Sequence, residues 1–160
     1  MSNARNLARL LPNASGQLPD AAMSSGSVLQ VVQSQNTTPV TINSSGYIDL
    51  GVSATITVQA NSRIYADAVI PVYSDGTAGG AWAAMQIALF EGSTLLAYSE
   101  HVGTVNNEAQ SYQIPLSFDI GSRAAGTYTF SLKANRVVDG TRYVKRDNRI
   151  GVLRLTEVSA

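Results

Sequence analysis

The regular alternation of apolar and polar residues is the feature that most restricts the fold of this 160-residue chain. In residues 111–120 (SYQIPLSFDI), every second side chain from Tyr112 to Ile120 is apolar. A period of two places such a set on one face of a β-strand. The same alternation recurs in residues 63–73 and 127–135. The chain therefore contains several segments that each need to bury one face of a strand.

Shorter segments extend this pattern and are separated by residues that favour turns. Further strands are predicted at residues 28–33, 47–50, 53–58, 82–91, 94–100 and 149–158. Residues 82–91 also suit a helix, but a hairpin turn at Glu91, Gly92 and Ser93 favours a strand. A second hairpin is predicted around Asp139–Gly140. Pro115 lacks an N–H to donate, so residues 111–120 are expected at a sheet edge. The predicted fold is an all-β, antiparallel β-sandwich of jelly-roll type.

The first 27 residues differ from the rest of the chain. A short helix is predicted at residues 4–11, and Pro12 stops it. One side of this helix is apolar and is formed by Leu7, Leu10 and Leu11. Arg5 and Arg9 lie on the opposite side. A helix of this length is unstable alone in water, so it is expected to dock on another surface. Residues 12–27 are poor in apolar side chains and are typical of an extended linker. We therefore expect a docking peptide with linker at 1–27 and a β-sandwich domain at 28–160.

Two docking partners are open for this helix. A linker of this length reaches about 20 Å as a coil, so the helix can contact its own sandwich or a different protein. We favour a partner protein, because a displayed domain needs an anchor and no other segment offers one.

Composition excludes several classes of function. Lysine plus arginine equals aspartate plus glutamate at 11 each, so no net charge attracts the chain to nucleic acid. No run approaches the roughly 18 apolar residues of a membrane span, and the first residues do not resemble a secretory signal. Cysteine is absent, and His101 is the only histidine. No paired catalytic or metal-ligating set follows from the spacing, so we expect no enzyme activity, metal or cofactor.

Two groups of residues are candidates for ligand or interface contact. Seven of the 11 basic residues lie between Lys133 and Arg154, and the candidates among them are Arg136, Arg142, Lys145, Arg146 and Arg149, with Tyr143 in their midst. They suit an anionic glycan, a lipopolysaccharide phosphate or an acidic capsid surface, or else form a solvated hairpin with ion pairs across strands. Trp82, with Tyr73 and Tyr98, suits stacking on a sugar near the Gly-rich loop at 74–81, or packing within the protein.

Several segments resemble the C-terminal domains of bacteriophage tail-fibre, head-fibre and decoration-type virion proteins. They are GSVLQVVQ (26–33), the segment 46–72 that contains SATITV, and RIGVLRLTEV (149–158). The opening ARNLARLLPNASGQLP (4–19) resembles the segments that precede such domains. The resemblance implies a β-sandwich that trimerises and projects from a virion. This chain has no repetitive shaft, which leaves a short tail appendage, a head fibre and a capsid decoration protein as alternatives.

We therefore expect a non-enzymatic virion structural protein on the particle surface, made in the host cytoplasm. The N-terminal peptide is expected to bind tail, portal-proximal or capsid proteins, and the sandwich to form a homotrimer. Loops 74–81 and 101–110 are expected to face outward and to contact a host surface glycan. Neither nucleic-acid binding nor membrane insertion is expected. A capsid decoration protein is the alternative within the virion, and a free carbohydrate-binding module is the alternative outside it.

Overall fold

A computed structural model describes residues 25–60, 62–74, 83–103, 110–137, 142–144 and 148–159. In this part of the chain ten strands are present and no α-helix. None of the described segments is a helix long and apolar enough to span a membrane. The predicted helix at residues 4–11 lies outside the described residues.

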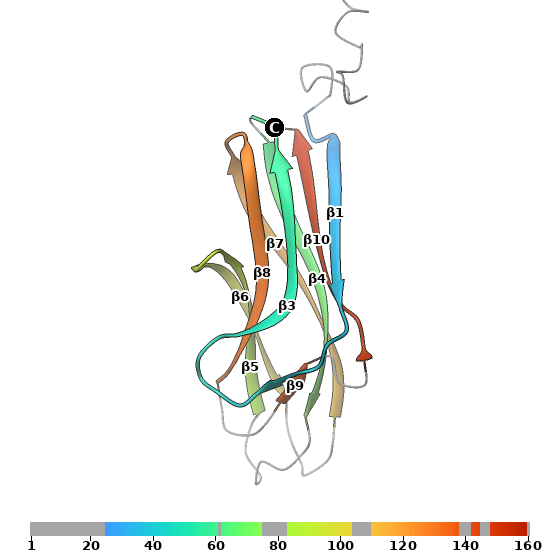
Figure 1. Ribbon diagram of the computed structural model, residues 1–160, viewed down its shortest axis with the longest axis vertical. Helices are drawn as coiled ribbons and strands as arrows, with labels where there is room; N and C mark the ends of the chain where they lie inside the picture. The colour runs from blue at the N-terminus through green and yellow to red at the C-terminus, as the bar shows by residue number, and fades with distance from the viewer. Residues whose placement is uncertain are drawn as a thin grey trace, which may run out of the picture.

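The strands form two antiparallel sheets (Figure 1). Sheet A contains β1 (Val28–Asn36), β10 (Gly151–Ser159), β4 (Ser62–Ser74) and β7 (Gln110–Arg123), extended by the short strands β9 (Arg142–Val144) and β2 (Val40–Ile42). Sheet B contains β3 (Ile48–Val58), β8 (Gly126–Arg136), β5 (Ala83–Glu91) and β6 (Thr94–Gly103). The predicted β-sandwich is confirmed.

The pairing of the eight long strands is nested from the outside inward. Strand β1 pairs with β10, β3 with β8, β4 with β7, and β5 with β6, all antiparallel. A long hairpin that pairs in this way and then wraps into two facing sheets is a jelly roll. The jelly-roll topology anticipated from the sequence is therefore present.

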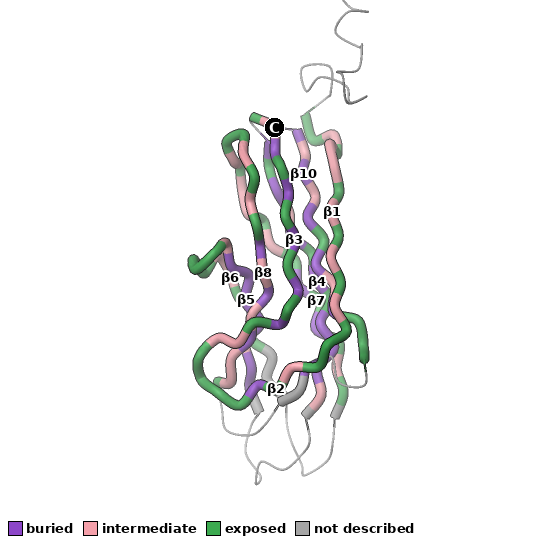
Figure 2. Tube along the Cα trace, in the orientation of Figure 1, coloured by how far each residue is buried: buried purple, intermediate pink, exposed green. Residues whose placement is uncertain are grey.

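The core lies between the two sheets and follows the predicted alternation (Figure 2). In β4 the buried set is Ile64, Ala66, Ala68, Ile70 and Val72, as the period of two requires. Strand β8 contributes Phe130, Leu132 and Ala134, and β5 contributes Met85, Ile87 and Leu89. In β7, which pairs only with β4 among the described strands, Ile114 and Leu116 are buried and Pro115 is exposed. The prediction of an edge strand at Pro115 is confirmed.

The strand prediction for residues 82–91 is also confirmed over a helix. Strand β5 begins at Ala83, and Glu91 pairs with Thr94 across a two-residue turn. Gly92 in this turn has φ +58°, while no positive φ is found at Ser93. A two-residue hairpin with this pattern is a type II′ turn, which favours glycine at its first central position.

Two predictions need correction, and one strand was not predicted. Residues 47–50 and 53–58 do not form separate strands, because β3 runs from Ile48 to Val58 through a bulge between Asp49 and Val52. Gly51 in this bulge has φ +63°, and its carbonyl accepts a 2.8 Å hydrogen bond from Asn36 Nδ2. Strand β2 was not predicted. The hairpin at Asp139–Gly140 was wrong, because β9 pairs with β2 and β4 and not with the preceding strand.

Candidate functional site

The N-terminal segment enters the sandwich at one end, which we call the terminal end (Figure 1). Gly26 N donates a 2.8 Å hydrogen bond to Ser159 O, and Ser159 N donates a 2.9 Å bond to Ser27 O. Strand β4 also begins here, since Ser62 pairs with Ser159 on one side and with Arg123 on the other. A partner that binds residues 1–24 is therefore attached to this end of the domain.

The two loops predicted to face outward depart from the opposite end, which we call the loop end. Residues 75–82 connect β4 to β5, and residues 104–109 connect β6 to β7. Their flanking residues pair with each other, Ser74 with Gln110 in sheet A and Ala83 with Gly103 in sheet B. The full length of β4, 13 residues, separates this end from the point where the N-terminal segment enters.

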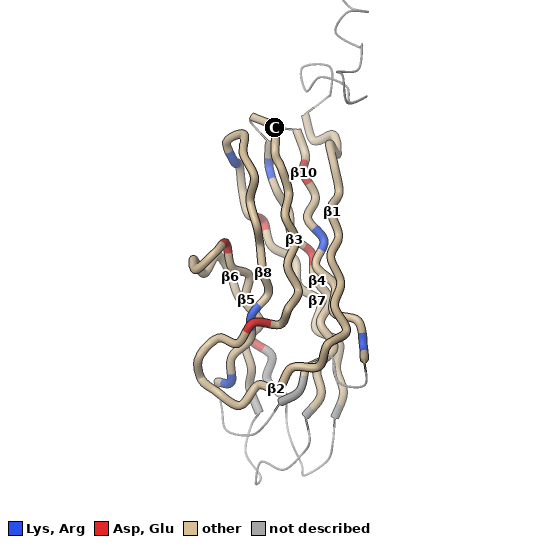
Figure 3. Tube along the Cα trace, in the orientation of Figure 1, with Lys and Arg blue, Asp and Glu red and all other residues tan. Residues whose placement is uncertain are grey.

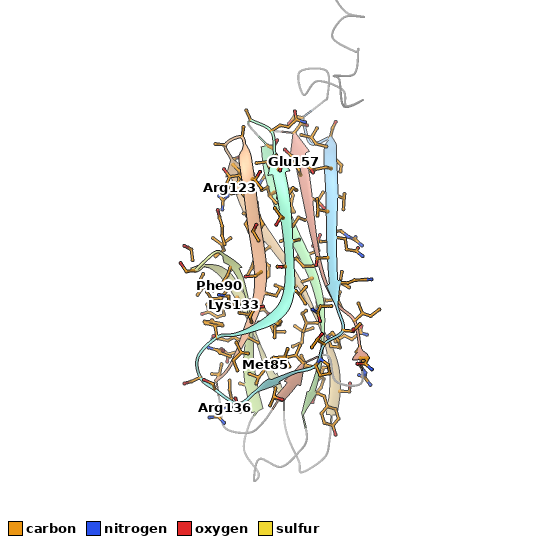
Figure 4. The ribbon with its side chains drawn as sticks, in the orientation of Figure 1. Met85, Phe90, Arg123, Lys133, Arg136 and Glu157 are labelled. Atoms are coloured by element: carbon orange, nitrogen blue, oxygen red, sulfur yellow. The ribbon has the colours of Figure 1, made fainter. Side chains whose placement is uncertain are left out.

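Several of the predicted basic positions gather at the loop end. Strand β9 places Arg142 opposite Ser74 and Tyr143 opposite Tyr73, at the last residues of β4. Arg136 closes β8 and lies opposite Met85, near the start of β5, at the lower end of Figure 4. Arg149 donates a hydrogen bond to Ser111 Oγ near the start of β7.

Other predicted residues do not join this group. Lys133 Nζ lies 4.5 Å from the centroid of the Phe90 ring on the outer face of sheet B (Figure 4). Arg154 lies on the outer face of sheet A, where its Nη2 donates to Gln33 Oε1 at 3.4 Å. The side chains of Arg142 and Tyr143 are outside the description. The structure describes no part of the other predicted residues, so their roles stay predictions. These are Trp82, Lys145, Arg146 and the docking residues Arg5, Leu7, Arg9, Leu10 and Leu11.

A polar and aromatic group on the outer face of sheet B was not predicted. Tyr47 donates a 3.0 Å hydrogen bond from its hydroxyl to Gln86 Oε1. Gln86 Nε2 in turn donates to Glu100 Oε2 at 3.2 Å. Gln86 and Glu100 are direct cross-strand partners on β5 and β6, so the sheet itself sets their spacing. We call Tyr47, Gln86, Phe90, Tyr98 and Glu100 the Tyr47 cluster.

Tyr47 lies across β5. Its ring centroid is 5.0 Å from that of Phe90 at an angle of 71°, while its hydroxyl reaches Gln86. Ala88 is midway between these two residues on the same face and is fully buried. Partial burial of Tyr47, and secondarily the nearby Tyr98, raise the pKa of Tyr47 above its ordinary 10.0. The Tyr47 side chain thereby fixes the segment between β2 and β3 against sheet B.

The Tyr47 cluster combines a ring that is open to solvent with oriented polar groups. Tyr98 is 55% exposed, directly across from Ala88. An exposed aromatic ring next to an amide and a carboxylate can stack on an apolar surface and accept hydrogen bonds from hydroxyl groups. Gln86 and Glu100 are three residues from the strand ends that lead into the loop end. No local sequence signal points to this group, because Tyr47 meets Gln86 only once β3 and β5 have taken their places in sheet B.

No metal site is apparent in the described residues, since they contain no group of three His, Cys, Asp or Glu side chains placed to hold an ion. The prediction that the chain is not an enzyme stays a prediction.

No family model matches the sequence, and no curated protein matches it. Among solved structures, a Bacillus endospore appendage from a family of disulfide-linked pili is similar at 10% identity and TM-score 0.38, over 86% of this chain and 96% of that one. PRD1 vertex protein P5 is similar at 10% identity and TM-score 0.37, over 84% of this chain and 100% of that one. The CBM36-1 domain of a xylanase from the hindgut metagenome of Trinervitermes trinervoides is similar at 11% identity and TM-score 0.40, over 79% and 96%. Similarities this distant do not indicate a function.

Proposed function

We propose that this chain is a non-enzymatic structural protein of a bacteriophage virion, displayed on the particle surface as a short host-recognition appendage. The observation that carries the proposal is the position of the two ends of the sandwich. The N-terminal segment is held at the terminal end by the bonds of Gly26 and Ser27 to Ser159. The two long loops depart from the loop end. A protein anchored through residues 1–24 would thus present the loops away from the particle.

The loop end has properties that suit contact with a host surface. It gathers the β9 residues Arg142 and Tyr143 with Arg136 and Arg149, which suit a phosphorylated or acidic glycan. A displayed loop on a rigid β-scaffold can vary without affecting the core. Binding to a host glycan is therefore assigned to the loop end, and binding to other virion proteins to residues 1–24.

Trimerisation, implied by the resemblance to virion proteins, is part of this proposal. Strands β7 and β1 are the outer long strands of sheet A, and β3 and β6 are those of sheet B. Unpaired strand edges invite association with other chains, and an oligomer is one way to cover them.

A free carbohydrate-binding module is a second candidate function, favoured by the Tyr47 cluster. Its exposed Tyr98 ring and the Gln86–Glu100 pair have the chemistry to bind a neutral sugar without any particle. A domain with glycan affinity that is absent from purified particles would support this second function.

The first test is the copy number of the chain in purified particles of the phage that encodes it, measured by quantitative mass spectrometry against the major capsid protein. A few copies per particle would support a tail or single-vertex appendage. A copy number comparable with that of the capsid protein would instead support a capsid decoration protein. Absence from the particle would overturn the virion proposal.

Variants can test whether one end binds the particle and the other end binds the host. A variant without residues 1–24 should fold but be absent from particles. Arg142→Glu in the full chain should be incorporated normally and should reduce adsorption to host cells. Arg63→Glu, at the terminal end and with its side chain 46% exposed, is the control for the charge reversal and should adsorb like the unchanged protein. If both variants adsorb as well as the unchanged protein, the loop end does not contact the host.

A further inference from the structure

The outer face of sheet A combines exposed apolar side chains with the charged residues Arg63, Asp67, Asp119 and Arg154. Val28, Val31 and Val69 on this face are 55%, 54% and 40% exposed. Val69 pairs with Val152 on one side and with the exposed Pro115 on the other, so one apolar row crosses β10, β4 and β7. Strand β1 carries no charged residue, and Figure 3 shows few along β10. A contiguous apolar row on an exposed sheet face is a candidate for an interaction site.

The outer face of sheet B is polar over β3 and β8. Thr55 Oγ1 lies 2.8 Å from Thr129 Oγ1, and Thr57 Oγ1 lies 3.0 Å from Thr127 Oγ1. These four threonines are exposed, and the hydroxyl groups pair across the strands. Threonine ladders of this sort are compatible with water on one side of a sheet. Over β3 and β8, sheet B is therefore the more polar of the two outer faces.

The centre of the sheet A face carries one charge of each sign. Arg154 and Asp67 are direct cross-strand partners on β10 and β4. Their side chains nevertheless turn apart, because Arg154 Nη2 donates to Gln33 Oε1 on β1 at 3.4 Å and Asp67 Oδ1 accepts from Ser117 Oγ on β7 at 2.8 Å. In a cyclic trimer, each copy can present its arginine to one neighbour and its aspartate to the other.

We infer that the outer face of sheet A is the surface through which copies of this chain pack on one another, with Val69, Val152 and Pro115 at its centre. This inference rests on the trimer in the proposed function and specifies the part of each subunit that faces the shared axis. Arg154 of one copy meets Asp67 of a neighbour. Packing through this face also brings β1 and β7, the outer long strands of sheet A, next to other copies. The threonine face of sheet B and the loop end stay exposed.

The test is the oligomeric state of the full chain by analytical ultracentrifugation and light scattering. The unchanged protein should sediment as a trimer. Val69→Lys should shift the population to monomer, because a lysine in the apolar row must lose its hydration in the interface. Thr55→Lys, at an exposed position of a sheet B strand, is the matched control and should stay trimeric. Circular dichroism and thermal unfolding should show that both variants are folded.

A charge exchange keeps the inference testable if Val69→Lys does not fold. The single variants Asp67→Arg and Arg154→Asp each place like charges across the interface and should weaken assembly at low ionic strength. The double variant restores opposite charges and should assemble again. A Val69→Lys trimer as stable as the unchanged protein would overturn the assignment of this face while leaving the trimer intact. A monomeric unchanged protein would overturn both the inference and the trimer, whereas the copy number in particles tests the virion proposal separately.

Discussion

Gln30 donates a hydrogen bond of 2.5 Å from its Nε2 to Oε2 of Glu157, a carboxylate that is fully buried. The other carboxylate oxygen, Oε1, accepts a 2.8 Å bond from Gln59 N. Gln30 and Glu157 belong to sheet A, whereas Gln59 directly follows β3 of sheet B. Gln30 Nε2 also donates to Thr57 O of β3 at 2.6 Å. This buried group therefore joins the two sheets at the terminal end (Figure 4).

Removing the Glu157 carboxylate should destabilise the domain strongly. In Glu157→Ala, the Gln59 N–H and the Gln30 amide lose a buried acceptor, so we expect a loss of about 1–3 kcal/mol in the free energy of unfolding. Urea denaturation followed by circular dichroism measures this loss. Glu100→Gln, on the exposed outer face of sheet B, is the control and should change stability by less than about 0.5 kcal/mol. Equal stability of the two variants would contradict the role given to Glu157.

Gly92 should be the less replaceable residue of the β5–β6 turn. Gly92→Ala must hold a side chain at φ +58°, which costs about 1–2 kcal/mol, whereas Ser93→Ala retains a negative φ and should be nearly neutral. Thermal unfolding of the two variants compares these costs. A Gly92→Ala variant as stable as Ser93→Ala would contradict the type II′ turn.

The Asp119 carboxyl should titrate below the ordinary aspartate value. Its ion pair with Arg63, chiefly through the side-chain hydrogen bond, lowers the Asp119 pKa from 3.8, although partial desolvation opposes the shift. Because the folded pKa is the lower one, the stabilisation is present above pH 3.8 and is lost as the pH falls through the folded pKa. Carboxyl NMR of the folded protein measures the midpoint.

Arg63→Gln is the variant that tests the cause of this shift. It should return the Asp119 midpoint toward 3.8, because it removes the charge and the guanidinium hydrogen bond together. An Asp119 midpoint unaffected by Arg63→Gln would show that Arg63 does not cause the shift.

Tyr47→Phe should weaken the attachment of the segment between β2 and β3 to sheet B. The variant keeps the ring contact with Phe90 and loses only the hydrogen bond to Gln86, so we expect a loss of about 0.5–1.5 kcal/mol. Hydrogen exchange at residues 43–47 should become faster, and thermal unfolding gives the change in stability. Tyr98→Phe, on the exposed ring, serves as control. Unchanged exchange in Tyr47→Phe would show that the hydroxyl does not hold this segment.

The strands could be predicted where the alternation within one segment was enough to show which side chains face the core. The alternation in residues 63–73, 111–120 and 127–135 placed Ile70, Leu116 and Phe130 on the buried side, as the structure has them. The edge position of β7 followed from Pro115, because a missing N–H is a local property. The number and spacing of the strands predicted an antiparallel sandwich of jelly-roll type, but which strands pair came only from the structure.

The contacts that join distant segments could not be predicted in this way. Strand β9 pairs with β4 and β2 across more than 60 residues of sequence, so the local turn signal at Asp139–Gly140 indicated the wrong partner. Gln30 meets Glu157 only because β1 pairs with β10, and Tyr47 meets Gln86 only because the residue before β3 lies across β5. Composition and net charge likewise do not show how side chains divide between faces. They therefore did not predict the valines on the outer face of sheet A or the threonines on the outer face of sheet B.

The nested pairing sets the order in which the chain can reach its folded state. Strand β10 lies between β1 and β4, so sheet A stays open until residues 151–159 have left the ribosome. Sheet B can form earlier, because its last strand, β8, ends at Arg136. Partners far apart in sequence also slow the search for the native pairing. Sheet A, and with it the association face, should consequently form only once residues 151–159 are available to pair.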